Sequence, residues 1–278
     1  MNDKVLVGTS GYSFADWVGT VYPPNARARD FLPLYAELFD AVEINATYYR
    51  TPSPQTFARM VERTASDFAF VVKVPRGATH ERAALDREVG PFLEAIEPLR
   101  RAGRLRGLLA QFPTSFHPNE TSRRHLEHLA AAFPRDVPLA VELRRDDWIS
   151  SSTFALLERL GLAFVNVDLP VLPGLPRPSE TATSPVGYVR LHGRNAAAWW
   201  ARGAEAGDRY DYLYSPQELE GWAERVERLA ARTDVTFAFA NNCHLGQSVV
   251  NALQLRARLG QTEKRDATTL FAPTRAER

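Results

Sequence analysis

The feature that most constrains the fold of this 278-residue chain is a series of eight short apolar runs separated by segments of helical periodicity. One such segment repeats apolar residues at Leu219, Trp222, Val226 and Leu229, the spacing of a helix face. Strands that alternate with helices along a whole chain predict a parallel sheet, and eight such units close the sheet into a barrel. The predicted strands are residues 4–9, 41–46, 68–74, 107–112, 138–143, 162–168, 187–192 and 235–241.

We therefore predict an α/β fold, a single TIM-type (β/α)8 barrel over residues 1–260, with a polar and frayed tail over residues 261–278. Residues 193–214, after the seventh strand, form a long aromatic-rich loop on the side where barrel enzymes place their active sites. The crossover between the sixth and seventh strands cannot be a regular helix, because proline lacks the backbone N–H and clashes with the preceding turn. Its prolines are Pro170, Pro173, Pro176, Pro178 and Pro185.

Charge and composition exclude several classes of protein. The 34 basic and 33 acidic side chains give a net charge of +1, too small for a dedicated nucleic-acid coat or a polybasic membrane binder. Hydrophobic residues make up 45% of the chain, and no apolar stretch reaches the length of a membrane helix or of a secretory signal. Cys243 is the single cysteine, which excludes an intramolecular disulfide and any zinc site with two cysteine ligands. We expect a cytoplasmic protein with no membrane partner, and the sequence indicates no oligomeric state.

Polar side chains occupy the same alternate positions near the C-terminal ends of seven predicted strands. The outward side chains of a barrel strand pack under helices, so we predict that the polar set faces the lumen at the C-terminal face. Seven ionisable side chains should then converge in one cavity: Glu43, Lys73, Glu142, Arg144, Asp168, Arg190 and His192.

Roles follow from the chemistry of these groups. An internal ion network is the structural alternative, but stability alone is better served by apolar packing. We predict that Glu43 and Glu142 exchange protons, because burial or a second carboxylate shifts a carboxyl pKa toward neutrality. Lys73 is a catalytic lysine or a charge partner, and Arg144 and Arg190 suit a small phosphorylated or carboxylated ligand.

His192 is expected to assist as an acid, a base or a ligand. The remaining residues expected to line the substrate site are Asn45, Gln111, Asp168, Asn241, Tyr12, Trp148 and His80.

A metal site is the alternative use of the histidines. His192 and His244 follow neighbouring strands and, with Asp168 or Glu142, would form a two-histidine, one-carboxylate set. No tight ligand spacing supports that set, so we predict no metal site and no cofactor, with a divalent metal as the alternative. Cys243, beside His244, is either a nucleophile or a small residue in a packed turn.

An ordered set of motifs resembles the YecE-like family, catalogued as domain of unknown function 72. The matching segments are Gly8-Thr9-Ser10-Gly11-Tyr12-Ser13, Val42-Glu43-Ile44-Asn45, Val72-Lys73, Gln111-Phe112-Pro113, Val141-Glu142-Leu143-Arg144, Tyr188-Val189-Arg190-Leu191-His192 and Asn241-Asn242. The resemblance covers nearly the whole chain and implies a single TIM-type barrel with no established reaction. The chain departs from the family pattern at Arg145-Asp146-Asp147 and at Cys243.

Two functions are therefore weighed. The first is an enzyme, a hydrolase, lyase or isomerase, that uses acid/base catalysis on a small anionic substrate in the barrel mouth. The alternative is a nucleic-acid-binding or nucleic-acid-processing accessory protein, in which loop aromatics stack on bases while Arg194, Arg202 and Arg209 follow a backbone. The near-zero net charge disfavours the second.

Overall fold

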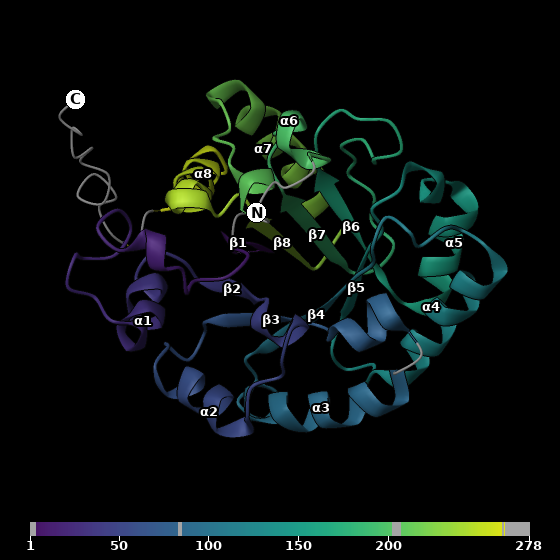
Figure 1. Cartoon of the computed structure of the whole chain (residues 1–278), viewed down its shortest axis with the longest axis horizontal. Coiled ribbons are helices and arrows are strands. Elements are labelled where there is room, and N and C mark those ends of the chain that lie inside the picture. Colours follow the sequence, from purple (N-terminus) through teal and green to yellow (C-terminus); the bar gives the residue numbers. More distant parts are fainter. Residues whose placement is uncertain (1–3, 83–84, 202–206, 263, 265–278) are drawn as a thin grey trace.

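The computed structural model describes residues 4–82, 85–201, 207–262 and 264. Eight parallel strands stand in the order β1-β8-β7-β6-β5-β4-β3-β2 and form a nearly closed barrel with helices outside it (Figure 1). This confirms the predicted TIM-type (β/α)8 barrel. The strands are β1 (Val5–Thr9), β2 (Ala41–Ile44), β3 (Ala69–Lys73), β4 (Leu105–Gln111), β5 (Leu139–Glu142), β6 (Ala163–Asp168), β7 (Val186–Leu191) and β8 (Val235–Ala240).

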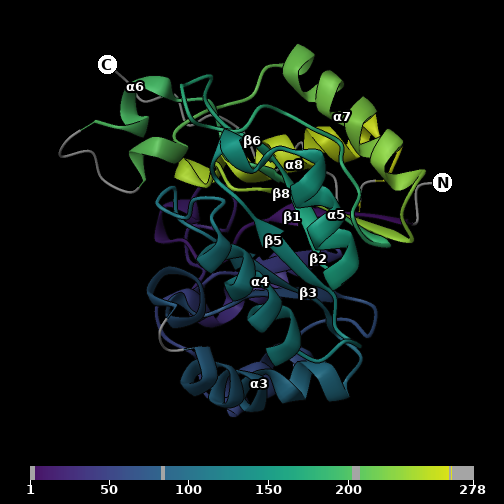
Figure 2. The ribbon, with the colours of Figure 1, turned by 90° about the vertical axis from the view of Figure 1, so that its right-hand side faces the viewer.

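The helices follow the strands in the order expected of a barrel. In the side view, the short helix α6, which follows the C-terminal end of β7, lies at one end of the barrel (Figure 2). The end with α6 is therefore the C-terminal face of the strands, where the loops gather. The α-helices are α1 (Phe31–Ala36), α2 (Pro54–Glu62), α3 (Leu85–Arg101), α4 (Glu120–Ala132), α5 (Ser151–Leu160), α6 (Ala196–Trp199), α7 (Pro216–Ala230) and α8 (Gln247–Arg258).

Local sequence explains where helices begin. α7 begins at Pro216, directly after Ser215, whose hydroxyl accepts a hydrogen bond from the Glu218 N–H while Glu218 accepts one from the Ser215 N–H. This reciprocal cap satisfies two backbone donors that a helix start leaves open. Trp222 and Leu229 lie on the buried face of the same helix, so the cap and the apolar face together fix α7 against the barrel.

The barrel has an apolar floor and a polar top. Inside it, Val71, Leu109, Ala140, Phe237 and Phe239 belong to one buried cluster, while a larger cluster fills the layer between strands and helices. The Phe237 and Phe239 rings stack with centroids 5.9 Å apart. Alternate side chains of each strand therefore serve two cores, and the inner core stops below the C-terminal ends of the strands.

The seam between β1 and β2 is bridged by a side chain. A single bridge between Ser10 and Glu43 joins these strands in the described residues, in place of a ladder. The Tyr35 hydroxyl accepts from the Thr9 N–H at 2.8 Å and donates to the Ala41 carbonyl at 3.0 Å. This hydroxyl therefore satisfies backbone groups that a ladder would otherwise pair.

The crossover between β6 and β7 contains no helix in residues 169–185, all of which the structure describes. The Asn166 side chain holds this loop against the barrel. Its amide donates to the Thr181 carbonyl at 2.9 Å, and its oxygen accepts from the Thr181 N–H and the Ser179 hydroxyl, both at 2.7 Å.

This arrangement corrects the predicted orientation of β6. Val165 and Val167 belong to the inner core, so Asn166 and Asp168 point outward, opposite to the prediction. The prediction assumed that helices cover the outer face of every strand. Where a polar loop covers it instead, polar residues are stable there because the loop supplies hydrogen bonds.

The tail predicted to begin at residue 261 is held at its start. The Gln261 amide donates to the Val5 carbonyl at 2.7 Å, and Arg256 donates to the Thr262 carbonyl at 3.0 Å. The rest of the predicted tail, residues 263 and 265–278, lies outside the described residues. Within the described part of the chain, no helix combines the length and the apolar character needed to cross a bilayer.

Candidate active site

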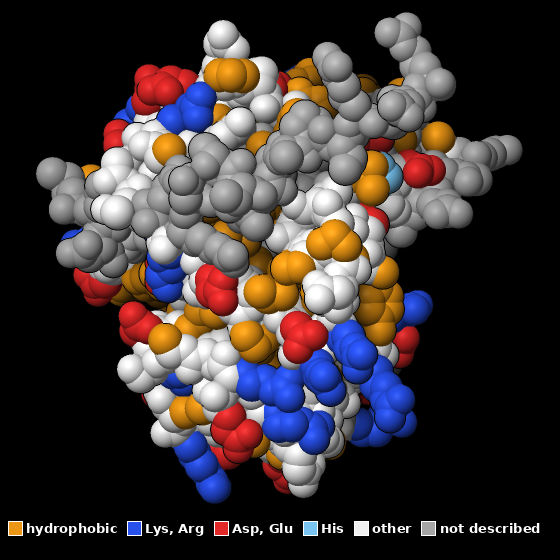
Figure 3. Space-filling model, turned by 90° about the vertical axis from the view of Figure 1, so that its left-hand side faces the viewer, with side chains coloured by type: hydrophobic (Ala, Val, Ile, Leu, Met, Phe, Trp, Pro, Cys, Tyr) orange, Lys and Arg blue, Asp and Glu red, His pale blue; other side chains and the backbone are white. Residues whose placement is uncertain are grey.

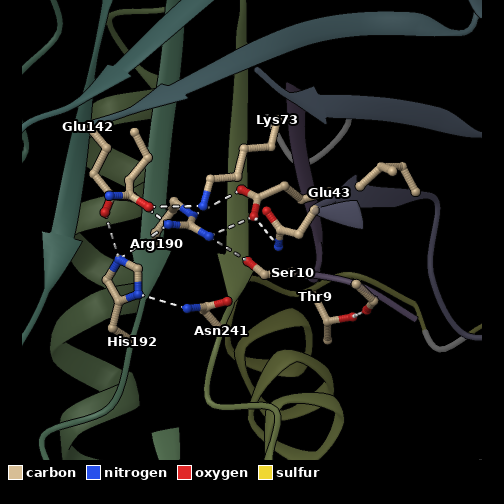
Figure 4. Close-up of polar contacts among 12 residues, drawn as sticks. Thr9, Ser10, Glu43, Lys73, Glu142, Arg190, His192 and Asn241 are labelled. Carbon is tan, nitrogen blue, oxygen red and sulfur yellow. Dashed lines mark hydrogen bonds and ion pairs between the residues drawn. The ribbon is translucent and has the colours of Figure 1, made fainter. Parts of the chain in front are cut away.

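Arg190, at the end of β7, is the centre of a buried ionic cluster (Figure 4). Its guanidinium donates to both Glu43 oxygens, at 2.7 and 3.0 Å, and to one Glu142 oxygen at 2.5 Å. Glu43 comes from β2 and Glu142 from β5, so one arginine joins three separated strands across the lumen. All three side chains are at most 2% exposed.

The two carboxylates are held ionised. Burial alone would raise the pKa of Glu43, but the charge and hydrogen bonds of Arg190 and a 2.6 Å hydrogen bond from the Tyr188 hydroxyl lower it. For Glu142, burial is likewise outweighed by Arg190 and Arg144, and its pKa lies well below the usual value. At neutral pH both groups are hydrogen-bond acceptors with no proton to give.

His192 lies beside Glu142 as a neutral ring. Its Nε2 is 3.3 Å from a Glu142 oxygen, and its Nδ1 is 2.9 Å from the Asn241 amide nitrogen. Burial lowers the pKa of His192 to about 4, against the opposing attraction of Glu142. With Asn241 donating to Nδ1, the remaining proton is on Nε2 and points to Glu142.

Lys73, at the end of β3, has no carboxylate as its hydrogen-bond partner among the described residues. Its ammonium nitrogen lies 2.9 Å from the Gln111 side-chain oxygen and 4.4 Å from the centre of the Tyr48 ring. Burial, together with the positive charges of Arg190 and Arg144, lowers the pKa of Lys73 to about 7. A substantial fraction of this lysine is therefore an uncharged amine near neutral pH.

The rim above the cluster is positive. Arg144 donates through Nε to Glu142 at 2.5 Å, and its side chain is 16% exposed, so part of this side chain is open to solvent. His80 packs edge-on against Tyr48, with ring centres 5.0 Å apart. Burial and the nearby charges of Lys73 and Arg144 lower the pKa of His80 to about 4. An anion would relieve the repulsion among these groups.

A cavity of about 320 Å³ opens beside the cluster, between the loops that follow β1 and β2. Asn45 connects the two, because its amide donates to a Glu43 oxygen at 3.0 Å while it also lines the cavity. The Asn45 side-chain oxygen is buried and has no hydrogen-bond partner in the part of the chain that the structure describes. The other walls include Ser10, Tyr12, Phe14, Tyr49 and Met60.

The structure brings together most of the predicted site residues. Six of the seven predicted ionisable groups form or border the cluster, and Gln111, Asn241, Asn45, His80 and Tyr12 lie around it. Two predicted residues are elsewhere, and sequence reasoning missed Tyr188. Tyr188 had a readable signal, because it shares the alternate position of Arg190 and His192 on β7.

Asp168 is the ionisable residue that the prediction misplaced. It accepts from Arg194 at 2.8 and 3.0 Å, and Arg194 also donates to Glu218 at 2.8 Å. The Tyr212 hydroxyl completes the group by donating to Glu218 at 2.7 Å. This outer cluster, Asp168, Arg194, Glu218 and Tyr212, lies outside the barrel wall and fastens the long loop to α7.

Trp148 also lies away from the site. Its indole N–H donates to the Phe116 carbonyl at 2.6 Å, and its ring stacks on Phe116 with centres 5.3 Å apart. Of the arginines assigned to a nucleic-acid backbone, Arg194 is bound in the outer cluster, and Arg202 lies outside the described residues.

The described residues form neither the alternative metal site nor a reactive thiol. Among the residues that the structure describes, no group of three or more potential metal ligands converges. His244 faces Asp211 at 3.9 Å rather than His192. Burial raises the pKa of Cys243 to about 12, so this thiol stays protonated and lacks the reactivity of a nucleophile.

Comparisons with known proteins all lead to the same family. A family model described as "Protein of unknown function DUF72" matches residues 6–276. The UPF0759 protein YunF of Bacillus subtilis is 25% identical over 268 residues, which cover 90% of this chain and 93% of the relative. The UPF0759 protein YecE of Escherichia coli K12 is 31% identical over 144 residues, about half of each chain.

Solved structures give the same result. A DUF72 family protein from Thermotoga maritima superposes with a TM-score of 0.85 at 41% identity, over 92% of this chain and 99% of that one. A second, from Enterococcus faecalis, gives a TM-score of 0.83 at 27% identity, over 93% and 96% of the two chains.

Proposed function

Because this chain belongs to the DUF72 family of proteins of unknown function, we propose its activity from the site itself. The protein is an enzyme that binds a small anionic substrate in the barrel mouth and transforms it by acid/base catalysis. Lys73 is the group that takes and returns the proton, and Arg144 holds negative charge on the substrate.

The observation that carries this proposal is the surplus of positive charge around Lys73. Arg190 and Arg144 already occupy the two buried carboxylates, and the Lys73 nitrogen bonds to the neutral amide of Gln111. A network built for stability would pair this lysine with an acid or replace it with an apolar side chain. A buried cation without a carboxylate instead supports a role in binding an anion or moving a proton.

The composition of the chain adds a second argument. Three of the 34 basic side chains are lysines, namely Lys4, Lys73 and Lys264. Arginine is effectively always charged, whereas a buried lysine is able to lose its proton at neutral pH. In a chain that uses arginine almost everywhere else, a lysine at this buried position supports a role as a proton acceptor.

In the proposed reaction, the lone pair of the neutral Lys73 amine accepts a proton from the substrate or from a water molecule. The resulting ammonium returns a proton to the product, so the enzyme ends unchanged. Arg144 directs its two terminal N–H₂ groups at the oxyanion that develops. Bound anionic substrate raises the pKa of Lys73 by attraction, which favours its protonated form after the transfer.

The carboxylates then have positioning roles. Glu142 holds Arg144 and Arg190, while Glu43 and Tyr188 fix the other side of Arg190. We assign proton transfer to Lys73 rather than to Glu43 and Glu142, because both carboxylates are kept ionised by arginine.

A substrate panel tests the proposal. The protein is incubated in D₂O with sugar phosphates and sugar acids, and products and deuterium incorporation are followed by NMR and mass spectrometry. Conversion or exchange of a panel member is expected, with kcat/KM rising through about pH 7 as Lys73 of the free enzyme loses its proton.

Lys73→Met should reduce the rate at least about a thousandfold, within the range that loss of general acid/base catalysis causes. Lys4→Met is the matched control, because Lys4 bonds to the Thr233 carbonyl at the opposite end of the barrel. A Lys73→Met enzyme as active as the Lys4→Met enzyme would overturn the assignment.

A further inference from the structure

A second cavity, of about 340 Å³, lies between the turn Ala28–Asp30 and α2. Arg29, Arg59 and Arg63 line it. The face that carries α1 and α2 shows a concentration of basic side chains (Figure 3). We call this cavity the arginine groove.

The arginines of the groove are short of counter-charges. Arg29 lies 3.7 Å from Asp30, but within the described residues no carboxylate lies within 4 Å of the Arg59 or Arg63 guanidinium. Arg59 lies in the last turn of α2, and Arg63 is the residue that follows the helix, so two like charges stand four positions apart at its C-terminal end. Arg63 donates to the Arg29 carbonyl at 2.8 Å, which joins α2 to the turn across the groove.

The arginine groove adjoins the cavity beside the ionic cluster. Tyr12 and Met60 line both cavities, so the two share a wall. Beyond this wall the lining changes from basic to largely apolar, with Phe14 from the loop after β1 and with Asn45 and Tyr49 from the loop after β2. Tyr49 is 83% exposed, an unusual position for an aromatic side chain beside a cavity.

We propose that the arginine groove binds the phosphate group of an elongated substrate, a phosphate ester of a ring-bearing compound. The ring lies between Tyr12, Tyr49 and Met60, and the reacting end reaches Lys73. This inference rests on the proposed function, and it names the substrate class and a second point of attachment. Three guanidinium groups suit a phosphate dianion, because each donates to oxygen in a planar fork.

The unpaired Asn45 oxygen supports the same direction of binding. It is a buried acceptor at the inner end of the apolar cavity, where a hydroxyl or amine of the ligand would satisfy it. Binding energy gained at the phosphate, away from the reacting atoms, would position the other end against Lys73.

Calorimetric titration with phenyl phosphate tests the subsite, with inorganic phosphate and phenol as the two half-probes. The wild-type chain should bind phenyl phosphate more tightly than either half. The variant Arg59→Ala/Arg63→Ala should bind it at least about tenfold more weakly, and added salt should weaken wild-type binding.

The matched control is Arg87→Ala/Arg135→Ala, which removes the same charge from exposed arginines on other faces. The control should bind within twofold of wild type. Equal weakening in both double variants, or no weakening in Arg59→Ala/Arg63→Ala, would overturn the subsite.

Different results would refute the proposed function and the arginine groove. Lys73→Met should bind phenyl phosphate as wild type does while it loses turnover. Retained turnover in Lys73→Met would refute the proposed chemistry and leave the groove standing. Unchanged binding in Arg59→Ala/Arg63→Ala would refute the groove and leave the chemistry standing.

Discussion

Two polar clusters lie near the C-terminal ends of the strands, one inside the barrel and one outside it. They differ in whether their charged groups have partners of opposite charge. In the outer cluster, Arg194 donates to Asp168 and Glu218, and Tyr212 adds a further bond. The charges are enclosed by partners from α7 and the long loop. In the inner cluster, Lys73 donates to a neutral amide, and the Arg144 side chain is partly open to solvent.

The difference teaches that composition does not separate a structural cluster from a functional one. Each cluster contains a buried carboxylate bound by arginine. The outer cluster has an excess of acid and is built around one loop, whereas the inner cluster has an excess of base beside a cavity. Buried charged groups that lack a partner of opposite charge within the protein point to a ligand.

The largest effect is expected from Glu142→Gln. The amide removes the charge that balances Arg190 and Arg144, and a broken buried ion pair costs about 4 kcal/mol. Thermal unfolding should show a fall in the midpoint of roughly 10 °C for a chain of this size. An unchanged midpoint would show that water already solvates the inner arginines, and the contrast in burial between the clusters would disappear.

Arg194→Met tests the outer cluster in the same way. The buried Asp168 would lose its cation, and about 3 kcal/mol of unfolding free energy should be lost. Denaturant titration measures the loss. Phenyl phosphate binding should not change, and a binding defect would place the outer cluster in the site.

Lys73→Met should change the free energy of unfolding in the opposite direction. It removes a buried cation that has no carboxylate partner and leaves an apolar chain of similar length, so unfolding free energy should rise by about 2 kcal/mol. Denaturant titration of this variant beside Arg194→Met measures the contrast directly. A loss of stability in both variants would mean that the two clusters are equally structural.

The smallest effect concerns pH. The pKa of Lys73 is about 7 in the fold and about 10.4 in an unfolded chain, so the unfolded chain binds more protons between these values. Stability from this group is therefore gained as pH rises above 7. From pH 7 to 8 the wild-type chain should gain roughly 1 kcal/mol relative to Lys73→Met. A constant difference between the two chains across that interval would contradict the lowered pKa.

The barrel itself could be predicted from the sequence because period-two and period-3.6 patterns report directly on local structure. The alternation also placed Glu43, Lys73, Glu142 and Arg190 on the lumen side. It failed for Asp168, because alternation shows which residues share a face and not what covers that face. The five prolines had already indicated a crossover without a helix, and a polar loop there permits polar residues outside.

The chemistry of the inner cluster could not be predicted in the same way. Whether Glu43 or Lys73 moves a proton depends on which of them Arg190 contacts, and these residues come from β2, β3 and β7. Distances across the lumen set those contacts, and a linear pattern carries no such distances. The arginine groove was missed for the same reason, since Arg29 and Arg59 are on separate elements.

The seam between β1 and β2 gives the barrel a built-in elasticity. Elsewhere around the ring, widening breaks pairs of backbone hydrogen bonds, but here it stretches the contacts of one hydroxyl, that of Tyr35, and one bridge. The cavity walls at Ser10 and Asn45 stand on either side of this seam. A ligand that enters there would push against this seam. Arg190 donates to Ser10 on one side of the seam and to Glu43 on the other, so its hydrogen bonds would change when the seam widens.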